Sequence, residues 1–287
     1  RVVLNIFRSL DSGVCVVSVH CLYRVTVAVI AICVFMFANG FPAIAEIGPA
    51  NFLLGTEWRP GQNLFGIFPM IIGSIYVTAG AIIVGVPIGI LCAVFLAFYC
   101  PKKLYSLLKP AVDLLAGIPS IVYGFFGLVV IVPVIQQVFS TGGKGILTAS
   151  ILLGIMILPT IIGVTESSLR AVPESYYEGS LALGATKERT IFRSVMVAAK
   201  SGVMSGVILG IGRAIGETMA VIMVAGNQAA IPESILSGVR TLTANIVLEM
   251  AYAADLHRDA LIATAVVLFV FILIINICFS LVKRRNG

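Results

Sequence analysis

The chain has 287 residues, of which 59% are hydrophobic and only 11% are charged, with a net charge of +6. Soluble domains usually carry roughly 25% charged residues, so the composition excludes an ordinary soluble protein. Several segments stay apolar for about 20 residues, which is the length of a helix that crosses a bilayer. The sequence therefore predicts an all-α polytopic membrane protein.

Six transmembrane helices are predicted, at residues 24–45, 68–98, 110–138, 146–168, 199–226 and 259–282. Lysines and arginines are enriched in cytoplasmic loops, and they divide very unequally between the two sides of this arrangement. Four lie on the poorer side, Arg59, Lys144, Arg240 and Arg258. The richer side holds Arg1, Arg8, Arg24, Lys102, Lys103, Lys109, Arg170, Lys187, Arg189, Arg193, Lys200, Lys283, Arg284 and Arg285. We expect that side, with both termini, to be cytoplasmic, so the positive charge needs no nucleic-acid partner.

An N-terminal segment, residues 1–67, is expected to hold the first span and an outside loop. Trp58, the single tryptophan, is predicted to mark the membrane interface, with a partner contact as the alternative. No cleavable signal peptide is expected, because a small-residue cleavage site is missing. The cysteines form no metal-ligand pattern, and none falls in an outside loop, so neither a metal site nor disulfides are expected. The six are Cys15, Cys21, Cys33, Cys92, Cys100 and Cys278.

The remaining residues, 68–283, are expected to form one transmembrane domain. Its third span contains Gly117, Pro119 and Ser120. Glycine and proline two residues apart should interrupt the helix, and unwound backbone at membrane depth survives only against protein or a water-filled cavity. We therefore predict a helix break that lines a passage; a simple kink is the alternative.

A large cytoplasmic loop, at about residues 171–198, follows the fourth span. Pro173 and Glu174 favour a helix start, and Gly184 should separate this helix from a second short one that runs through Ile191. The first helix carries a short apolar stripe, Tyr177, Leu181 and Leu183. The pattern indicates a docking surface for a soluble partner, or alternatively a helical linker resting on lipid headgroups.

The fifth span contains Arg213 and Glu217, four residues apart within apolar sequence. On a continuous helix both would share a face with Gly202, Gly206 and Gly210, and such small-residue ridges allow close helix approach. Each charge costs roughly 2.5–3.5 kcal/mol at the centre of a bilayer. Either the two form a self-neutralised pair that fixes helix register, or Arg213 faces an anion pathway. In the second case Glu217 would hold Arg213 in place and weaken its grip on the anion.

Enzyme chemistry finds little support in the sequence. His257-Arg258-Asp259 lacks the other kinase motifs. The residues around Lys144 do not fit a phosphate-binding loop, because that motif needs glycine at 138 and serine or threonine at 145, where this chain has Val138 and Gly145. With only two histidines, His20 and His257, zinc or triad catalysis is not expected. Any ATP that drives this chain must bind another subunit.

Three phrases carry a resemblance to a known family. In the cytoplasmic loop, Glu178, Gly179, Ser180 and Gly184 resemble the coupling motif of ABC-importer permeases, and so does Ala182-Leu183-Gly184-Ala185-Thr186. The downstream element departs from that family at Ser194–Val197, which affects the shape of the second coupling helix. LAGIPSIVYG (115–124) and GRAIGETMAV (212–221) resemble the PstC-type permeases of phosphate-specific importers. The likeness runs from about Trp58 to Asn227.

This resemblance implies a six-helix type I ABC importer permease in the bacterial cytoplasmic membrane, in contact with lipid, that moves inorganic phosphate inward. It implies a homologous PstA-type permease, two copies of a cytoplasmic ATPase and a periplasmic phosphate-binding protein as partners. ATP and Mg would bind the ATPase, and no cofactor would bind this chain. The implied pathway residues are Arg213 and Glu217, with Gly117, Pro119 and Ser120 at the helix break. The implied coupling residues are Glu178, Gly179, Ser180, Ala182, Gly184, Ala185 and Thr186.

Other functions stay open at this point. A permease for another oxyanion, such as sulfate or molybdate, would share most of these features. An ATP-independent secondary transporter is a further alternative, although it should show inverted repeats, and none is evident in the sequence. A membrane enzyme is the least favoured reading, because the sequence offers no nucleophile–base or metal constellation.

Overall fold

The computed structural model describes the backbone of residues 2–286 and the side chains of residues 22–278, 280 and 281. The predictions on some charged, cysteine and histidine side chains fall outside this set: Arg1, Arg8, Cys15, His20, Cys21, Lys283, Arg284 and Arg285. The described chain is helical apart from loops and one small antiparallel hairpin. The hairpin pairs β1 (Trp58–Arg59) with β2 (Leu64–Phe65), with Trp58 opposite Phe65. The predicted all-α class is therefore confirmed.

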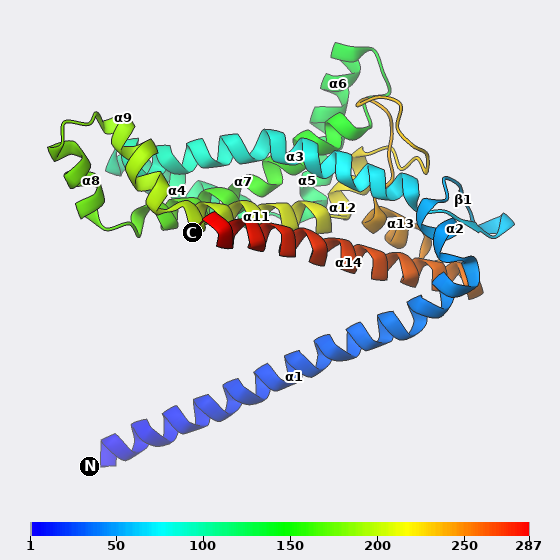
Figure 1. Ribbon diagram of the computed structural model, residues 1–287, viewed down its shortest axis with the longest axis horizontal. Coiled ribbons are helices and arrows are strands. Elements are labelled where there is room, and N and C mark those ends of the chain that lie inside the picture. The colour runs from blue at the N-terminus through cyan, green and yellow to red at the C-terminus, as the bar shows by residue number, and fades with distance from the viewer. Residues whose placement is uncertain (1, 287) are drawn as a thin grey trace.

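Four long helices form the bundle: α3 (Phe68–Val94), α7 (Ile146–Arg170), α11 (Lys200–Gly216) and α14 (Asp255–Asn286). They run along the long axis of the molecule (Figure 1). The central helix α7 packs against both α3 and α11. Glycine permits the close α3–α7 approach, because a Cβ at Gly85 would lie 2.8 Å from the carbonyl oxygen of Gly154. Small residues at helix contacts are the usual means of tight packing in membranes.

Five helical segments of the described chain are long and apolar enough to cross a membrane: Leu22–Ile47, Phe68–Tyr99, Ser120–Phe139, Ile146–Arg170 and Asp255–Cys278. A sixth arises if the helical stretch 187–198 and α11 are counted together, although they meet at a bend of 74°. The structure thus supports five to six of the six predicted spans.

The two ends of the bundle carry different structures (Figure 1). The loop end carries α8 (Glu174–Ala182), α9 (Lys187–Thr190), a π-helical turn η4 (Ile191–Val195) and α10 (Met196–Ala198). The same end includes a second π-helical turn, η2 (Phe95–Tyr99), which finishes α3. The hairpin end carries α2 (Pro49–Leu54), β1, the 3₁₀ turn η1 (Pro60–Gln62), β2 and α13 (Leu242–Glu249).

Helix α1 (Val2–Ile47) meets the bundle only at the hairpin end and slopes away from it toward its N-terminus (Figure 1). It continues through Pro42, beyond the predicted end of the first span at residue 45. Its last turns pack on α14, where Phe37 meets Phe269 edge to face at 5.9 Å between ring centres. Gly40 lies against Ala263 and Val266 of α14, and a Cβ at this position would lie 2.7 Å from a Val266 methyl group.

Two of the predicted spans are divided in the structure. The predicted span at 110–138 is wrong in its start, because α4 (Lys102–Gly117) is a separate helix that begins earlier. The segment long enough to span comprises α5 (Ser120–Phe126), the π-helical turn η3 (Gly127–Ile131) and α6 (Val132–Phe139). The predicted continuous span at 199–226 is also wrong, since α11 ends at Gly216 and α12 (Met219–Val224) begins anew.

Trp58, predicted to mark the membrane interface, is buried inside the protein. The residue is 7% exposed, its ring packs edge to face on Phe65, and its indole Nε1 donates a hydrogen bond of 2.7 Å to Glu249 in α13. Glu249 also pairs with Arg240 and with His257. The hairpin end therefore folds around a buried carboxylate, which accepts a hydrogen bond from the indole.

Candidate functional site

The two helix breaks lie beside one another, because the helices that follow them pack together. Helix α5 follows the first break, α12 follows the second, and the two are in direct contact. Glycines allow this approach: a Cβ at Gly124 would lie 3.0 Å from the Cα of Ala220, and one at Gly127 would lie 2.9 Å from a Val224 methyl group. The fold thus gathers two interrupted segments, about 100 residues apart in sequence, at one place in the bundle.

The first break is the one that the sequence predicts. Helix α4 ends at Gly117, and Ile118 and Pro119 are extended, with ψ near 128° and 141°. The Tyr123 hydroxyl donates a hydrogen bond of 2.8 Å to the carbonyl of Leu115 and so bridges the gap. Gly117 and Pro119 are exposed and Ser120 is half-buried. The predicted helix break is confirmed, while its role in lining a pathway stays a prediction.

The second break overturns the predicted pairing of Arg213 with Glu217. The backbone at Glu217 is extended, with φ −70° and ψ 134°, so its side chain does not follow Arg213 by one helical turn. Its Oε1 instead accepts hydrogen bonds from the backbone N–H groups of Thr218, at 3.1 Å, and Ala220, at 3.3 Å. A carboxylate is favoured there, because it satisfies amides that a new helix leaves unpaired and interacts well with the helix dipole.

Arg213 is half-buried and lies in the last turn of α11, immediately before the second break. Its Nη1 makes one long hydrogen bond, of 3.5 Å, to Thr160 Oγ1 of α7. It is also close enough to Tyr123 of α5 to interact with it electrostatically. Within the described residues no ion pair neutralises it. The site therefore holds a cation with unused donors next to unwound backbone, a combination that suits an oxyanion.

The glycine ridge of α11 faces α7, as predicted for a helix-packing face. A Cβ at Gly202 would lie 2.1 Å from Ser168 Oγ, and one at Gly210 would lie 2.9 Å from Ile161 Cγ1. At Gly206 the nearest atom would be the Thr165 hydroxyl oxygen, at 3.1 Å. This tight contact continues toward Arg213 and fixes the position of the guanidinium relative to α7.

The predicted coupling motif forms two short helices joined by a tight turn at the loop end. Gly184 has φ +84°, a conformation that L-residues rarely adopt. Thr186 caps α9, since its hydroxyl accepts from the N–H of Arg189 at 3.3 Å, and Ser180 and Thr190 join their hydroxyls at 2.9 Å. Leu183 is 91% exposed at the tip. The other predicted residues of the motif, Glu178, Gly179, Ala182 and Ala185, lie on the same two helices and turn, and all but the half-buried Ala185 are exposed.

The apolar stripe predicted on this loop is only partly buried. Tyr177 stacks on Phe98 of η2, with ring centres 6.1 Å apart and planes 8° from parallel, whereas Leu181 and Leu183 are exposed. A second attachment comes from Lys187, whose Nζ donates to the Phe98 carbonyl at 3.1 Å and lies over the Tyr99 ring at 4.5 Å. The loop is thus anchored to the π-helical end of α3, and its tip is free.

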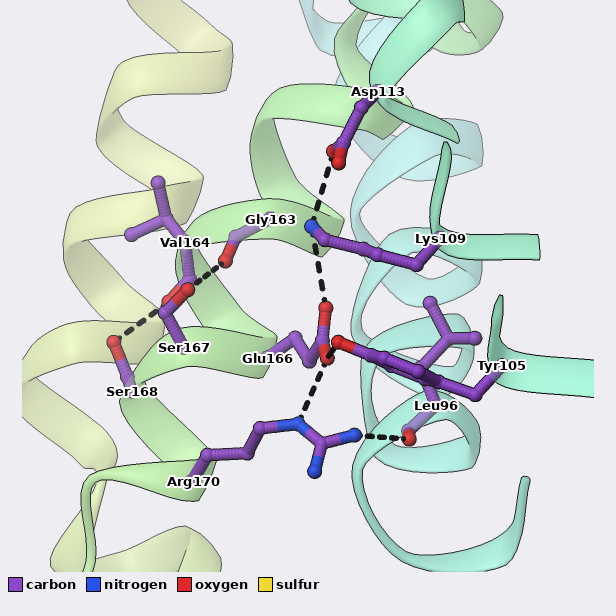
Figure 2. A network of polar contacts seen from close by, with 10 residues as sticks. All are labelled: Leu96, Tyr105, Lys109, Asp113, Gly163, Val164, Glu166, Ser167, Ser168 and Arg170. Carbon is purple, nitrogen blue, oxygen red and sulfur yellow. Dashed lines mark hydrogen bonds and ion pairs between the residues drawn. The ribbon is translucent and has the colours of Figure 1, made fainter. Parts of the chain in front are cut away.

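A buried carboxylate near the loop end is the feature that the sequence reasoning missed. The Glu166 side chain is 2% exposed. It accepts from the Tyr105 hydroxyl at 2.7 Å and from Arg170 Nε at 2.8 Å, and it pairs with Lys109 Nζ at 3.3 Å (Figure 2). The hydrogen bond to Glu166 raises the pKa of the Tyr105 phenol above its usual value. The available signal was an acidic residue four positions before Arg170 inside an apolar span.

Comparison with known proteins supplies the family. Residues 85–286 match the family described as "Binding-protein-dependent transport system inner membrane component". The chain belongs to this family of ABC importer permeases. Its structure is similar to a crystal structure of the MetNI methionine ABC transporter in inward facing conformations, with a TM-score of 0.60 at 19% identity. That match covers 80% of this chain and 100% of the other, and it shows the shared fold.

Curated relatives of this binding-protein-dependent permease are transport permease proteins. The chain is 38% identical to the probable ABC transporter permease protein YqgH of Bacillus subtilis, over 89% of this chain and 86% of the relative. It is 35% identical to the phosphate transport system permease protein PstC of Mesorhizobium japonicum, over 85% and 81% of the two chains. The probable PstC of Methanocaldococcus jannaschii is 30% identical, over 91% and 90%.

Proposed function

We propose that this chain is the PstC-type permease subunit of an ATP-driven importer that moves inorganic phosphate into the cytoplasm. The observation that carries the proposal is the half-buried Arg213 beside two helix breaks, in a chain whose relatives include several phosphate transport permeases. A guanidinium presents planar paired donors that match phosphate oxygens. The absence of an ion pair to Arg213 among the described residues leaves these donors available for an anion.

The partners follow from the surfaces that the fold leaves open. The breaks at Gly117 and at Gly216 are exposed in the single chain, and a homologous PstA-type permease packed against them would enclose the passage. Two copies of a cytoplasmic ATPase would dock at the permease coupling loops, here around the exposed Leu183. A periplasmic phosphate-binding protein would deliver the anion at the hairpin end. ATP and Mg would bind the ATPase subunits.

The membrane orientation is part of the same proposal. Lys102, Lys103, Lys187, Arg189 and Arg193 all lie at or near the loop end. Since cytoplasmic segments are enriched in lysine and arginine, the loop end would face the cytoplasm and the hairpin end the periplasm. Both termini would then be cytoplasmic, and the ATPase and the binding protein would act on opposite faces of the membrane.

Transport would proceed by alternating access to the same site. Closure of the ATPase dimer would displace the coupling loop, and the bundle would rock between outward-open and inward-open arrangements. The broken segments are suited to line the site, because their unpaired backbone groups can face a wet cavity but not lipid. Arg213 would bind the anion with donors that are largely unused, since its only described hydrogen bond is the long one to Thr160, and the change of access would expose the bound anion to the cytoplasm for release.

The test is transport by the reconstituted complex in liposomes, with radiolabelled phosphate and the binding protein outside. The proposal expects ATP-dependent uptake that sulfate and molybdate do not compete away. Competition by either oxyanion at equal concentration would assign a different substrate within the same family. Uptake by this chain alone, without ATP, would instead show a secondary transporter and contradict the proposal.

A further inference from the structure

Glu166 joins three elements at the loop end of the bundle (Figure 2). It belongs to α7 and lies one turn before the final residue of that helix, Arg170. It reaches α4 through Tyr105 and Lys109. It reaches α3 through Arg170, whose Nη2 donates to the Leu96 carbonyl of η2 at 2.9 Å. One carboxylate therefore fixes the relative positions of α3, α4 and α7 at the start of the cytoplasmic loop.

Helix α4 has few other attachments at the loop end. It has no buried residue, and its apolar contacts are confined to a small cluster in which Tyr105, Leu108 and Val112 meet α3 and α7. Its described polar contacts with other helices at this end are the two to Glu166. Because α4 ends at Gly117, any shift of α4 along or around its axis moves the first helix break directly.

The charges of the cluster make the link specific. Glu166 is paired with Lys109 and Arg170, and Lys109 also pairs with Asp113 at 3.0 Å, so two anions face two cations. The guanidinium of Arg170 also lies over the Tyr105 ring, 4.6 Å from its centre. Separating a buried carboxylate from its cations is costly. The cluster therefore favours movement of α4 and the end of α7 as one unit.

The segment that leads from Arg170 into the loop has room to move. Two hollows, of about 420 and 370 Å³, flank residues 171–173, and Val172 and Pro173 line both. Two side chains donate to carbonyls of the same π-helical turn, η2. Arg170 donates to the Leu96 carbonyl, and Lys187, farther along the loop, donates to the Phe98 carbonyl. A push on the loop thus reaches η2 and the Glu166 cluster from both sides.

We propose that Glu166 is a positioning residue that carries displacement of the coupling loop through α4 to the first helix break at Gly117. This inference rests on the proposed function, in which an ATPase pushes on that loop. Glu166 contacts no transported anion and takes no part in ATP hydrolysis. Its effect is on the coupling between the two.

The first experiment compares coupling in reconstituted complexes that carry Glu166→Gln or Lys103→Gln. Lys103 is an exposed α4 cation outside the cluster and serves as the control. We expect Glu166→Gln to hydrolyse ATP at the wild-type rate but to import about fivefold fewer anions per ATP, or fewer still. If the number of anions imported per ATP hydrolysed does not change, the proposal is overturned and Glu166 has a merely structural role. The same holds if uptake and ATP hydrolysis fall by the same factor. If Glu166→Gln fails to assemble, Tyr105→Phe removes a single hydroxyl, and the ratio must still fall.

A second measurement does not depend on the transported substrate. Spin labels at Leu107→Cys on α4 and at Arg193→Cys on the loop, both exposed positions, report the separation of the two elements when ATP is added. We expect the distance to stay constant in the otherwise wild-type complex and to change in the Glu166→Gln complex. A distance that changes equally in both would overturn the link. Failure of phosphate uptake alongside a constant distance would refute only the proposed substrate.

Discussion

The buried Glu249 at the hairpin end gives a sharp prediction about the stability of that end of the molecule. Its side chain is 8% exposed and receives Trp58 Nε1 at 2.7 Å, His257 Nε2 at 2.8 Å and Arg240 Nη1. Glu249→Leu keeps a similar volume but leaves the Arg240 charge, whose side chain is 18% exposed, without its carboxylate.

The magnitude follows from these contacts. Removing one partner of a buried ion pair costs about 3–5 kcal/mol, and an unsatisfied indole N–H costs about 1–3 kcal/mol. Arg240 retains hydrogen bonds to Asn245 Oδ1 and to the Asn227 carbonyl, both at 3.1 Å, so the lower part of the combined range applies. We expect a loss of about 4–5 kcal/mol, which corresponds to local opening that is roughly 1,000- to 5,000-fold more frequent.

The assay is amide hydrogen exchange on the purified chain in nanodiscs. Protection of the backbone at 58–67 and 242–249 should fall by that factor in Glu249→Leu, while amides of α7 stay protected. Glu57→Gln is the matched control, because Glu57 pairs with Arg59 at 3.6 Å with both side chains more than half exposed, and such pairs contribute little. Equal exchange in the two variants would refute the reasoning that Glu249 holds this segment together.

Two glycine substitutions test the loop and the bundle. Gly184→Leu should weaken ATPase co-purification about 5- to 30-fold, because φ +84° costs an L-residue about 1–2 kcal/mol. The expected cause is backbone strain and not a wedge between the two helices, since a Cβ at Gly184 would meet no atom within 4 Å. Asparagine tolerates this φ, so the Gly184→Asn variant should bind the ATPase nearly normally. Equal loss of binding in the two variants would contradict the argument. Gly85→Ala should lower stability by about 1–3 kcal/mol in thermal unfolding, because its Cβ would lie 2.8 Å from the Gly154 carbonyl oxygen. Gly163→Ala, whose Cβ would meet nothing nearer than Lys109 Nζ at 4.0 Å, should change stability little, and a similar loss there would point to a general effect of losing glycine.

The sequence predicted one helix break and missed the other for a physical reason. Glycine and proline interrupt a helix through their own backbone properties, so Gly117 and Pro119 predict the first break without knowledge of the tertiary structure. Around Glu217 the residues Gly-Glu-Thr contain no proline, and the apolar pattern continues through Val224. That break depends on tertiary structure, since α12 packs on α5 and Glu217 caps α12.

The buried carboxylates were hidden from sequence reasoning for a related cause. Tyr105 is 61 residues from Glu166, and Trp58 is 191 residues from Glu249. The spacing of Glu166 and Arg170 was a local signal, but nothing local shows that Tyr105 joins Glu166 or that Trp58 joins Glu249. The location of most helices, the turn at Gly184 and the α11 glycine ridge could be predicted, because each depends on spacing along a single segment. Pairings across the bundle could not.

The most direct test of the account is phosphate uptake by the complex that carries Arg213→Gln. Arg24→Gln, an exposed cation on α1, is the control. Loss of the charge and its paired donors should reduce uptake about 100-fold or more, while assembly and basal ATP hydrolysis stay normal, and the control should transport like wild type. Uptake by Arg213→Gln at the wild-type rate would contradict the claim that this guanidinium borders the anion path.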